Sequence, residues 1–473
     1  MLNFTDRSFL KGNMELFKLF KINNELINTK ETDKNELSKL FFKKLFEPLI
    51  EIQNRSLRFC IFLFNKQILN ISKLRLESTK RNFVYSFILF KLKILSKFRK
   101  IRVGFLVSEE AKWTNQNLYN EFKCDKHFEP FILLTYFSRP QGEYSPEEFY
   151  KKTRDFFKQQ GVKIYNTYDV VKKAHKNLNK YRADIIFYQQ PWMIADIQKP
   201  NTVFNKTLLC YVPYCFYSMN SYINYLAKFH GIMWKYFVET DLHKTEYKTL
   251  YGANNCYVSG STKLDNFQYL DKEKSEYHWT TKDKKRIIYA PHHSFVDNFH
   301  EVATFLENGN FILNLAKSHP ETEWIIRPHP LFVDRIIRNS IMTEDEINEY
   351  FEQWKKIGRI SESENYYEMF LSSDLLITDC ISFLTEYALT LKPIIHLRKN
   401  KQKDEFNSIV KKLDTGYYQV YSNEELEKIF NSLIKDNNDF LKEKREKNID
   451  ILNTSTPASK KIYEYIKKEL KIK

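Results

Sequence analysis

The pattern of apolar and polar positions changes close to residue 100. From there onward, short apolar runs rich in β-branched residues alternate with longer polar stretches. Such runs are typical of strands buried on both faces of a parallel sheet, and the polar stretches have the length of helices. The alternation therefore predicts a doubly wound α/β fold.

The predicted strands fall into two successive groups, which indicates two Rossmann-like domains. The first domain is expected over residues 99–242, with strands near 100–107, 128–137, 161–168, 183–190, 208–214 and 234–240. The second is expected over residues 243–473, with strands near 254–260, 285–293, 323–330, 374–379 and 392–397. Two more helices are predicted after the last strand, and a capping box of Ser422 and Glu425 begins the first of them.

Residues 1–98 follow a different pattern, which is basic, aromatic and helical in spacing. Leu37, Phe41 and Leu45 lie four positions apart, as on one face of a helix. Residues 51–100 contain twelve basic and two acidic residues, and this excess of ten positive charges is most of the net +16 of the chain. We expect a basic amphipathic helical region that binds an anionic membrane surface. The alternative is a helical arm that packs on the main body.

Composition narrows the class of protein further. An apolar fraction of 42%, with only 10 Gly and 13 Pro, is typical of a globular chain. The six cysteines are scattered without a CxxC pair, which argues against a zinc or disulfide framework and fits a reducing compartment. The N-terminal segment lacks a signal-peptide layout, and no run reaches the roughly 18 apolar residues that span a membrane. We expect a cytoplasmic protein without a nucleic-acid-binding module.

Candidate chemistry lies directly after three predicted strands of the second domain. His292 and His293 follow the first, Arg327 and His329 the second, and Thr378, Asp379 and Ser382 the third. Ligands of open α/β sheets bind at the carboxyl ends of the strands, and Arg and His suit phosphate oxygens. Glu386, one helical turn beyond Ser382, can reach ribose hydroxyls. The set outlines a site for a nucleotide diphosphate, whereas each residue taken alone also fits a structural role, such as Asp379 capping a helix.

These residues recur in a series of motifs that resembles the CDP-glycerol glycerophosphotransferase family. The family pattern is GxPRxD, YAPTxR, RxHP, SDxLITDYSSxxxDY and KPI. This chain has, in the same order, SGSTKLD at 259–265, YAP at 289–291, RPHP at 327–330, SDLLITD at 373–379 and KPI at 392–394. The similarity covers roughly residues 235–400, and its fourth motif is the most specific.

The resemblance implies a GT-B fold, in which two Rossmann-like domains face a cleft and the C-terminal domain holds a CDP-linked donor. It implies catalytic roles for His329, at the donor pyrophosphate, and for Asp379. The donor-binding set would then comprise His292, His293, Arg327, Thr378, Ser382, Glu386, Ser259 and Gly260. An acceptor hydroxyl would attack the β-phosphorus and expel CMP, with no metal and no cofactor beyond the activated substrate. The implied acceptor is a polysaccharide or lipid-linked polymer at the inner face of the cell membrane.

The chain also departs from the family pattern. A WHGTP-like segment, whose His resembles the general base, is replaced near residue 210 by a segment with Tyr211 and Tyr214. These are weak acceptor-side candidates because the pKa of an ordinary Tyr is near 10. His292 and His293 stand where the family has Thr and an aromatic residue. These changes indicate a divergent branch with a different donor or acceptor.

Two alternatives therefore stay open at this point. One is a GT-B glycosyltransferase that uses a nucleotide sugar in capsule or lipooligosaccharide synthesis. The other is a non-catalytic, basic membrane-binding protein with a degenerate transferase body.

Overall fold

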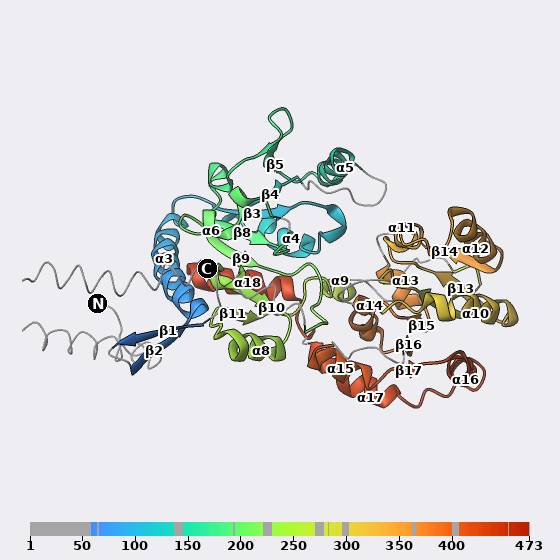
Figure 1. Ribbon diagram of the computed structural model, residues 1–473. Coiled ribbons are helices and arrows are strands. Elements are labelled where there is room, and N and C mark those ends of the chain that lie inside the picture. The colour runs from blue at the N-terminus through green and yellow to red at the C-terminus, as the bar shows by residue number, and fades with distance from the viewer. Residues whose placement is uncertain are drawn as a thin grey trace, which may run out of the picture. The chain divides into compact units, whose positions relative to one another are not determined.

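The computed structural model of the protein describes residues 58–472, except 64–65, 137–144, 193, 221–228, 270–278, 282, 296–301, 362–365, 400–405 and 453. The helical prediction for residues 1–57 lies outside the described residues. The chain divides into two units, Met1–Lys73 and Leu74–Lys473. Figure 1 shows the described residues as ribbons. No described helix is long and apolar enough to cross a membrane.

The described part of the first unit is a hairpin, not the helix that was predicted. Strand β1 (Arg58–Leu63) pairs antiparallel with β2 (Lys66–Ser72). β1 contains Phe and Ile and β2 contains two Ile, and both residue types are enriched in strands. Helix α3 (Lys73–Leu95) follows and agrees with the helical prediction for the end of this zone.

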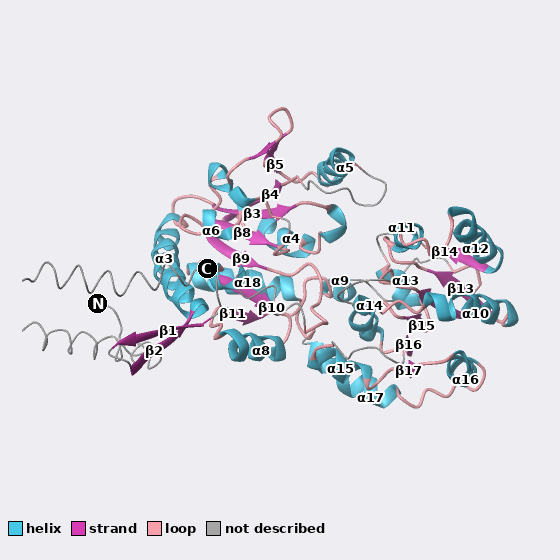
Figure 2. Ribbon diagram, in the orientation of Figure 1, coloured by secondary structure: helices cyan, strands magenta, loops and turns pink. Residues whose placement is uncertain are grey.

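The larger unit contains two parallel sheets, as the alternating pattern predicts (Figure 2). The first has seven strands in the order β11-β10-β9-β8-β3-β4-β5, all parallel. Their bounds are β3 Ile101–Val107, β4 Phe128–Leu134, β5 Ile164–Asn166, β8 Ile185–Tyr188, β9 Leu208–Tyr211, β10 Lys235–Val238 and β11 Cys256–Val258. A two-residue pair, β6 (Tyr168–Asp169) and β7 (Ala174–His175), stands apart from this sheet.

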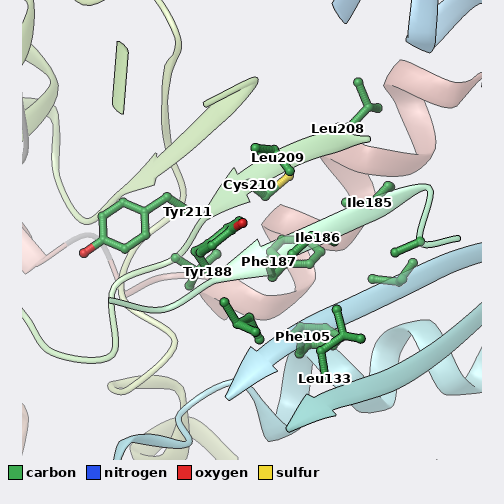
Figure 3. Close-up of a cluster of buried hydrophobic side chains, with 14 of the residues drawn as sticks. Phe105, Leu133, Ile185, Ile186, Phe187, Tyr188, Leu208, Leu209, Cys210 and Tyr211 are labelled. Atoms are coloured by element: carbon green, nitrogen blue, oxygen red, sulfur yellow. The ribbon is translucent and has the colours of Figure 1, made fainter. Parts of the chain in front are cut away.

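Buried side chains on both faces of the central strands stabilise this sheet. Phe105, Leu133 and Phe187 are almost fully buried in one cluster, to which β9 adds Cys210 and Tyr211 (Figure 3). Continuous apolar runs of this kind suit strands that helices cover on both sides. Helix α3 joins the same core through Tyr85, Ile88 and Leu92.

The second sheet has six parallel strands in the order β14-β13-β12-β15-β16-β17. Four were predicted, namely β12 Lys285–Ala290, β13 Thr322–Ile326, β15 Leu375–Thr378 and β16 Ile394–Leu397. The short edge strands β14 (Gly358–Ile360) and β17 (Tyr418–Val420) were missed. Three residues form too short an apolar run to stand out from a helical context.

The helices largely alternate with these strands. Those of the first domain are α4 Gln116–Cys124, α5 Pro146–Gln159, α6 Pro200–Val203 and α8 Asp241–Tyr251. The chain continues with α9 Asp265–Tyr269, α10 Phe305–Ser318, α11 Phe332–Arg338, α12 Glu344–Ile357, α13 Tyr367–Ser372, α14 Ile381–Glu386, α15 Ser408–Asp414, α16 Asn423–Ile434, α17 Lys442–Asn448 and α18 Ala458–Leu470. The predicted cap of α16 is present, since the N–H of Glu425 donates to Ser422 Oγ at 3.2 Å.

The border between the two domains differs from the predicted one at residue 242. Strand β11 pairs with β10 in the first sheet, although the sequence assigned it to the second. Helix α18 also returns to the first domain, where Ile462, Ile466 and Leu470 enter the core (Figure 1). The carboxylate of Asp265 accepts the N–H groups of Ala458 at 2.6 Å and Ser459 at 2.8 Å, which fixes the start of this helix.

Candidate functional site

The three polar strand ends of the second domain are neighbours in the sheet. Strand β12 lies between β13 and β15, so the segments that follow these strands emerge side by side. The N–H of His329 donates to the carbonyl of Pro291 at 3.1 Å and joins the first two segments. The expectation that these residues meet at one edge of one sheet is therefore confirmed.

Three imidazole rings converge at this edge. The rings of His293 and His329 are stacked, with centroids 3.9 Å apart and an interplanar angle of 23°. The ring of His292 lies 4.3 Å from that of His293 and 5.2 Å from that of His329. The N–H of Leu331 donates to His329 Nδ1 at 3.1 Å, and the N–H of Ser294 donates to His292 Nδ1 at 3.3 Å. The protein backbone thus orients two of the three rings.

Burial lowers the pKa of His329 well below its usual value. Electrostatic interactions with His293, His292, Lys263 and Arg327 lower this pKa further. The imidazole of His329 is consequently neutral at pH 7 in the absence of an anion. It meets a ligand as a hydrogen-bond donor or acceptor and not as a preformed cation.

The carboxylate of Asp379 is buried and bonded to the protein itself. It accepts the N–H of His292 at 2.6 Å, the N–H of Thr304 at 2.6 Å and the hydroxyl of Thr304 at 3.0 Å. Burial raises the pKa of Asp379, and these hydrogen bonds oppose that effect. Thr378 is equally internal, since its hydroxyl donates to the carbonyl of Ala290 at 2.7 Å. Both side chains hold the loops that carry the imidazoles.

Glu386 forms a buried ion pair with Lys263, whose Nζ lies 2.7 Å from Glu386 Oε1. The hydroxyl of Tyr366 donates to the other oxygen of the same carboxylate. Burial lowers the pKa of Lys263, but the charge of Glu386, its hydrogen bond to Lys263 and the neighbouring Tyr367 and Cys215 together outweigh burial, so the net pKa is raised. Lys263 and Tyr366 were missed as site residues, although Lys263 occupies the basic position of the motif at 259–265.

Arg327 contacts Tyr366, whose hydroxyl is bonded to Glu386. Its Nη1 donates to Ser361 Oγ at 3.2 Å, and its guanidinium lies over the ring of Tyr366, 4.7 Å from the centroid. Ser382 is in the first turn of α14, where Cys380 Sγ is 3.6 Å from its hydroxyl oxygen.

The motif that supplies Lys263 connects the two domains. Gly260 has a φ of 93°, a conformation that a side chain would strain. The hydroxyl of Ser259 donates to the carbonyl of Gly260 at 2.9 Å, and Thr262 Oγ1 lies 3.4 Å from Thr114 Oγ1 of the first domain. Ser259 is buried, so the geometry gives it a structural role.

The two acceptor-side candidates differ in setting. Tyr211 is fully buried, its hydroxyl contacts that of Tyr217, and burial raises its pKa well above 10. A buried phenol of this kind is a poor general base. The ring of Tyr214 is partly exposed and packs against Trp192 and Lys112, with Lys112 Nζ 5.3 Å from its centroid.

A second buried polar cluster was not predicted. Burial raises the pKa of Glu239 to about 8, and its Oε1 accepts the N–H of Tyr217 at 3.2 Å. Its Oε2 lies 3.5 Å from Nδ1 of His243, whose pKa burial lowers to about 4. Asn407 of the second domain donates to the carbonyl of Tyr217 at 2.5 Å. No motif marks this cluster, because its members come from three separate segments.

Comparisons with known proteins agree with this picture. Residues 233–466 match the family model described as CDP-Glycerol:Poly(glycerophosphate) glycerophosphotransferase. No curated protein sequence is significantly similar to the chain.

Solved structures share the fold of the chain at low sequence identity. One is UDP-GlcNAc 2-epimerase from Neisseria meningitidis bound to UDP-GlcNAc, with a TM-score of 0.52, 14% identity and coverage of 78% of this chain and 100% of that one. Another is the wall teichoic acid polymerase TagF, with a TM-score of 0.51, 13% identity and coverage of 84% and 97%. The fold is thus GT-B-like, with two Rossmann-like domains, as predicted.

Proposed function

Because residues 233–466 belong to the CDP-glycerol glycerophosphotransferase family, as a divergent member, we propose that the chain transfers glycerol phosphate or a related polyol phosphate. The donor is a CDP-activated alcohol, and the acceptor is a polysaccharide or a teichoic-acid-like polymer. The observation that carries the proposal is the family match over the same domain in which His292, His329 and Asp379 meet at one sheet edge.

In this reaction the acceptor hydroxyl attacks the β-phosphorus of the donor. A new phosphorus–oxygen bond forms to the acceptor, the bond from the β-phosphorus to the bridging oxygen breaks, and CMP leaves. The contribution of this site is positioning and charge stabilisation, which dominate phosphoryl transfer. Arg327 and Lys263 supply positive charge, and neutral His329 donates to a phosphoryl oxygen.

Asp379 acts as a positioning residue, because its carboxylate bonds the N–H of His292 and the start of α10. Glu386 acts through Lys263, which it fixes in the site. Ser382, on the first turn of α14, remains the residue of this helix that is proposed to contact the donor. Tyr211 is not proposed as the base, because it is buried against Tyr217.

A thermal-shift panel tests the donor class. We expect CDP-glycerol, CDP-ribitol and CMP to raise the melting temperature, because a ligand bound by the folded state alone stabilises it. UDP- and GDP-sugars serve as control ligands, because they carry a diphosphate but a different base. A shift with UDP or GDP compounds and none with cytidine compounds would favour a nucleotide-sugar glycosyltransferase and reject the proposal.

The second part of the proposal is that α3 binds an anionic membrane surface. Phe83, Phe87, Phe90 and Ile94 recur at helical spacing and are exposed, Phe83 by 82% and Phe87 by 70%. This exposed face lies opposite the buried residues of the same helix and near the basic segment 91–100. An apolar stripe beside lysines suits the interface of an anionic bilayer. It would keep the enzyme at the inner face of the membrane, near a lipid-linked acceptor.

Vesicle sedimentation tests this part. The full chain should pellet with phosphatidylserine vesicles at low salt, less at high salt, and weakly with phosphatidylcholine vesicles. A variant with Phe83→Ser, Phe87→Ser and Phe90→Ser should stay in the supernatant while it still binds CMP. Equal pelleting of the variant and the parent chain would reject α3 as the contact.

A further inference from the structure

The first sheet has a topological switch point of its own, separate from the donor site. The chain runs from β3 to β4 and β5 on one side and from β8 to β9, β10 and β11 on the other, so the strand order reverses between β3 and β8. In open α/β sheets, ligands bind outside the carboxyl ends of the two strands at such a reversal. The second sheet reverses between β12 and β15, which are followed by His292 and Asp379. A second ligand is therefore expected at the ends of β3 and β8.

Buried carboxamides gather at this reversal. Gln189 and Gln190 directly follow β8, and Asn115 lies between β3 and α4. The three residues are 3%, 7% and 1% exposed. Within the described part of the chain, Nε2 and Oε1 of Gln189, Oε1 of Gln190 and Oδ1 of Asn115 have no hydrogen-bond partner. A buried amide without a partner destabilises a fold, so its presence at a switch point indicates a ligand that supplies the missing hydrogen bonds.

The ends of the two strands are held next to each other. Leu106 of β3 is opposite Tyr188 of β8 in the parallel register, and Figure 3 shows the two strands side by side. Beyond them, Gln190 Nε2 donates to Ser108 Oγ at 3.3 Å. The unpaired amide of Gln189 therefore belongs to the same edge as the segment that follows β3.

The side chains of this edge favour a neutral ligand that is rich in hydroxyl groups. A carboxamide both donates and accepts hydrogen bonds, and so does a hydroxyl. The two acids after β3 are paired with lysines, Glu109 with Lys112, and Glu110 with Lys152 at 3.0 Å. These charges balance, so they leave no surplus of positive charge for a phosphate group.

Two aromatic rings lie beside the carboxamides. Trp192 and Tyr214 are partly exposed and pack edge to face, with ring centroids 5.9 Å apart. The N–H of Tyr214 donates to the carbonyl of Gln189 at 3.1 Å, which brings this ring's segment to the end of β8. Aromatic rings with a few placed polar groups are typical of small-molecule sites. A sugar ring matches them, because its C–H faces are apolar and its rim carries hydroxyls.

The segment after β9 connects this edge with the donor site. Burial raises the pKa of the Cys215 thiol, and the charges of Lys263, Glu386 and Lys112 also act on it. Cys215 directly follows Tyr214 in the chain. It therefore lies within electrostatic range both of the first-sheet edge and of the ion pair in the second domain.

We propose that the switch point of the first sheet binds a neutral polyhydroxyl unit of the acceptor, a sugar or a polyol, and that Gln189 and Gln190 select it through its hydroxyl groups. The inference rests on the proposed function and specifies which chemical group of the acceptor is recognised. Asn115 supplies a further hydrogen-bond acceptor, and Trp192 and Tyr214 contact the apolar face of the unit. Phosphate groups of the acceptor are not read at this edge.

A glycan array probed with the fluorescently labelled full chain tests the site. It carries neutral oligosaccharides, sialylated oligosaccharides and poly(glycerol phosphate), which separates a sugar, an acidic sugar and a polyol as the recognised unit. We expect the parent chain to bind neutral oligosaccharides or poly(glycerol phosphate), and Gln189→Met and Gln190→Met to bind them about 10-fold more weakly. Gln159→Met, at an exposed position of α5, is the matched control and should bind like the parent chain.

Thermal melting separates loss of binding from loss of folding. Gln189→Met should melt at or above the temperature of the parent chain, because methionine fills a similar volume without an unpaired buried amide. Weaker binding by this variant then reports the loss of contacts with the ligand.

Several outcomes would overturn the proposal. Unchanged binding in both Met variants would show that the carboxamides face water alone. Binding confined to sialylated oligosaccharides, or no binding by the parent chain, would also reject the site. Glutamine-dependent binding without any transfer from CDP-alcohols would retain the site and reject the proposed function. Transfer from CDP-glycerol to poly(glycerol phosphate), with an unchanged KM for this acceptor in both Met variants, would do the opposite.

Discussion

Replacement of Glu239 by Gln should stabilise the protein at neutral pH. The side chain is 1% exposed, and burial raises its pKa from the usual 4.5 to about 8. The folded state therefore binds a proton that the unfolded state releases above pH 4.5. Stability that is fully present below pH 4.5 is lost as the pH rises towards 8. At about 1.4 kcal/mol per pH unit, the loss by pH 7 is about 3 kcal/mol.

Glutamine avoids this loss because it carries no ionisable proton. Its carbonyl oxygen can still accept the N–H of Tyr217, as Glu239 Oε1 does at 3.2 Å. Its amide can face Nδ1 of His243, which lies 3.5 Å from Glu239 Oε2. The variant should therefore keep the contacts of the protonated acid.

Urea unfolding at pH 5 and pH 7 measures the effect. We expect the free energy of unfolding of Glu239→Gln to exceed that of the parent chain by about 3 kcal/mol at pH 7 and by less than about 1 kcal/mol at pH 5. Glu427→Gln, at an exposed position of α16, is the matched control and should change stability little at either pH. A stability difference between Glu239→Gln and the parent chain that is equal at both pH values would show that ionisation of Glu239 does not destabilise the fold.

Four further substitutions test the site and its supports. Lys263→Met and Glu386→Gln should each lower the free energy of unfolding in urea by about 3 kcal/mol, because either change leaves a buried charge without its partner. The double variant should lose less free energy of unfolding than the sum of the two single losses, and strict additivity would contradict the ion pair. Asp379→Asn should lower the free energy of unfolding by about 1–3 kcal/mol and weaken pyrophosphate binding, because the amide cannot accept the N–H groups of both His292 and Thr304. Unchanged pyrophosphate affinity would show that Asp379 does not position the imidazoles of His292 and His329. Asp265→Ala should make residues near 458 the first site of limited proteolysis, because the N–H groups at the start of α18 lose their acceptor. An unchanged cleavage pattern would contradict the role of Asp265 in fixing the start of this helix.

Much of the fold follows from the sequence, because short apolar runs rich in β-branched residues that alternate with helical stretches are typical of a buried parallel sheet. The apolar pattern does not show to which sheet β11 belongs, because the run at 256–258 could be a strand of either domain. Its pairing with β10 assigns it to the first sheet. Helix α18 shows the same limit: its apolar face is visible in the sequence, but its partner is not. The hairpin at 58–72 was mistaken for helix because basic and apolar residues mask its strand propensity.

The site was predictable in its location but less so in its contacts. Strand-end logic brought His292, His329 and Asp379 to one edge, where the structure has them. It could not tell that Asp379 faces backbone N–H groups of the protein, because that depends on how the chain folds back at Thr304. The ion pair of Lys263 with Glu386 could not be predicted either, because the two residues belong to segments that are distant in the sequence.

Transfer of a polyol phosphate from a CDP-activated donor is best tested by analysis of both reaction products. Purified full-length protein would be incubated with CDP-glycerol or CDP-ribitol and a polyol-phosphate acceptor, and both CMP and the phosphodiester product would be measured. We expect equimolar CMP and phosphodiester, with both lost in His329→Asn. Release of UDP or GDP from a sugar nucleotide with formation of a glycosidic bond, and no CMP from either CDP-alcohol, would contradict it.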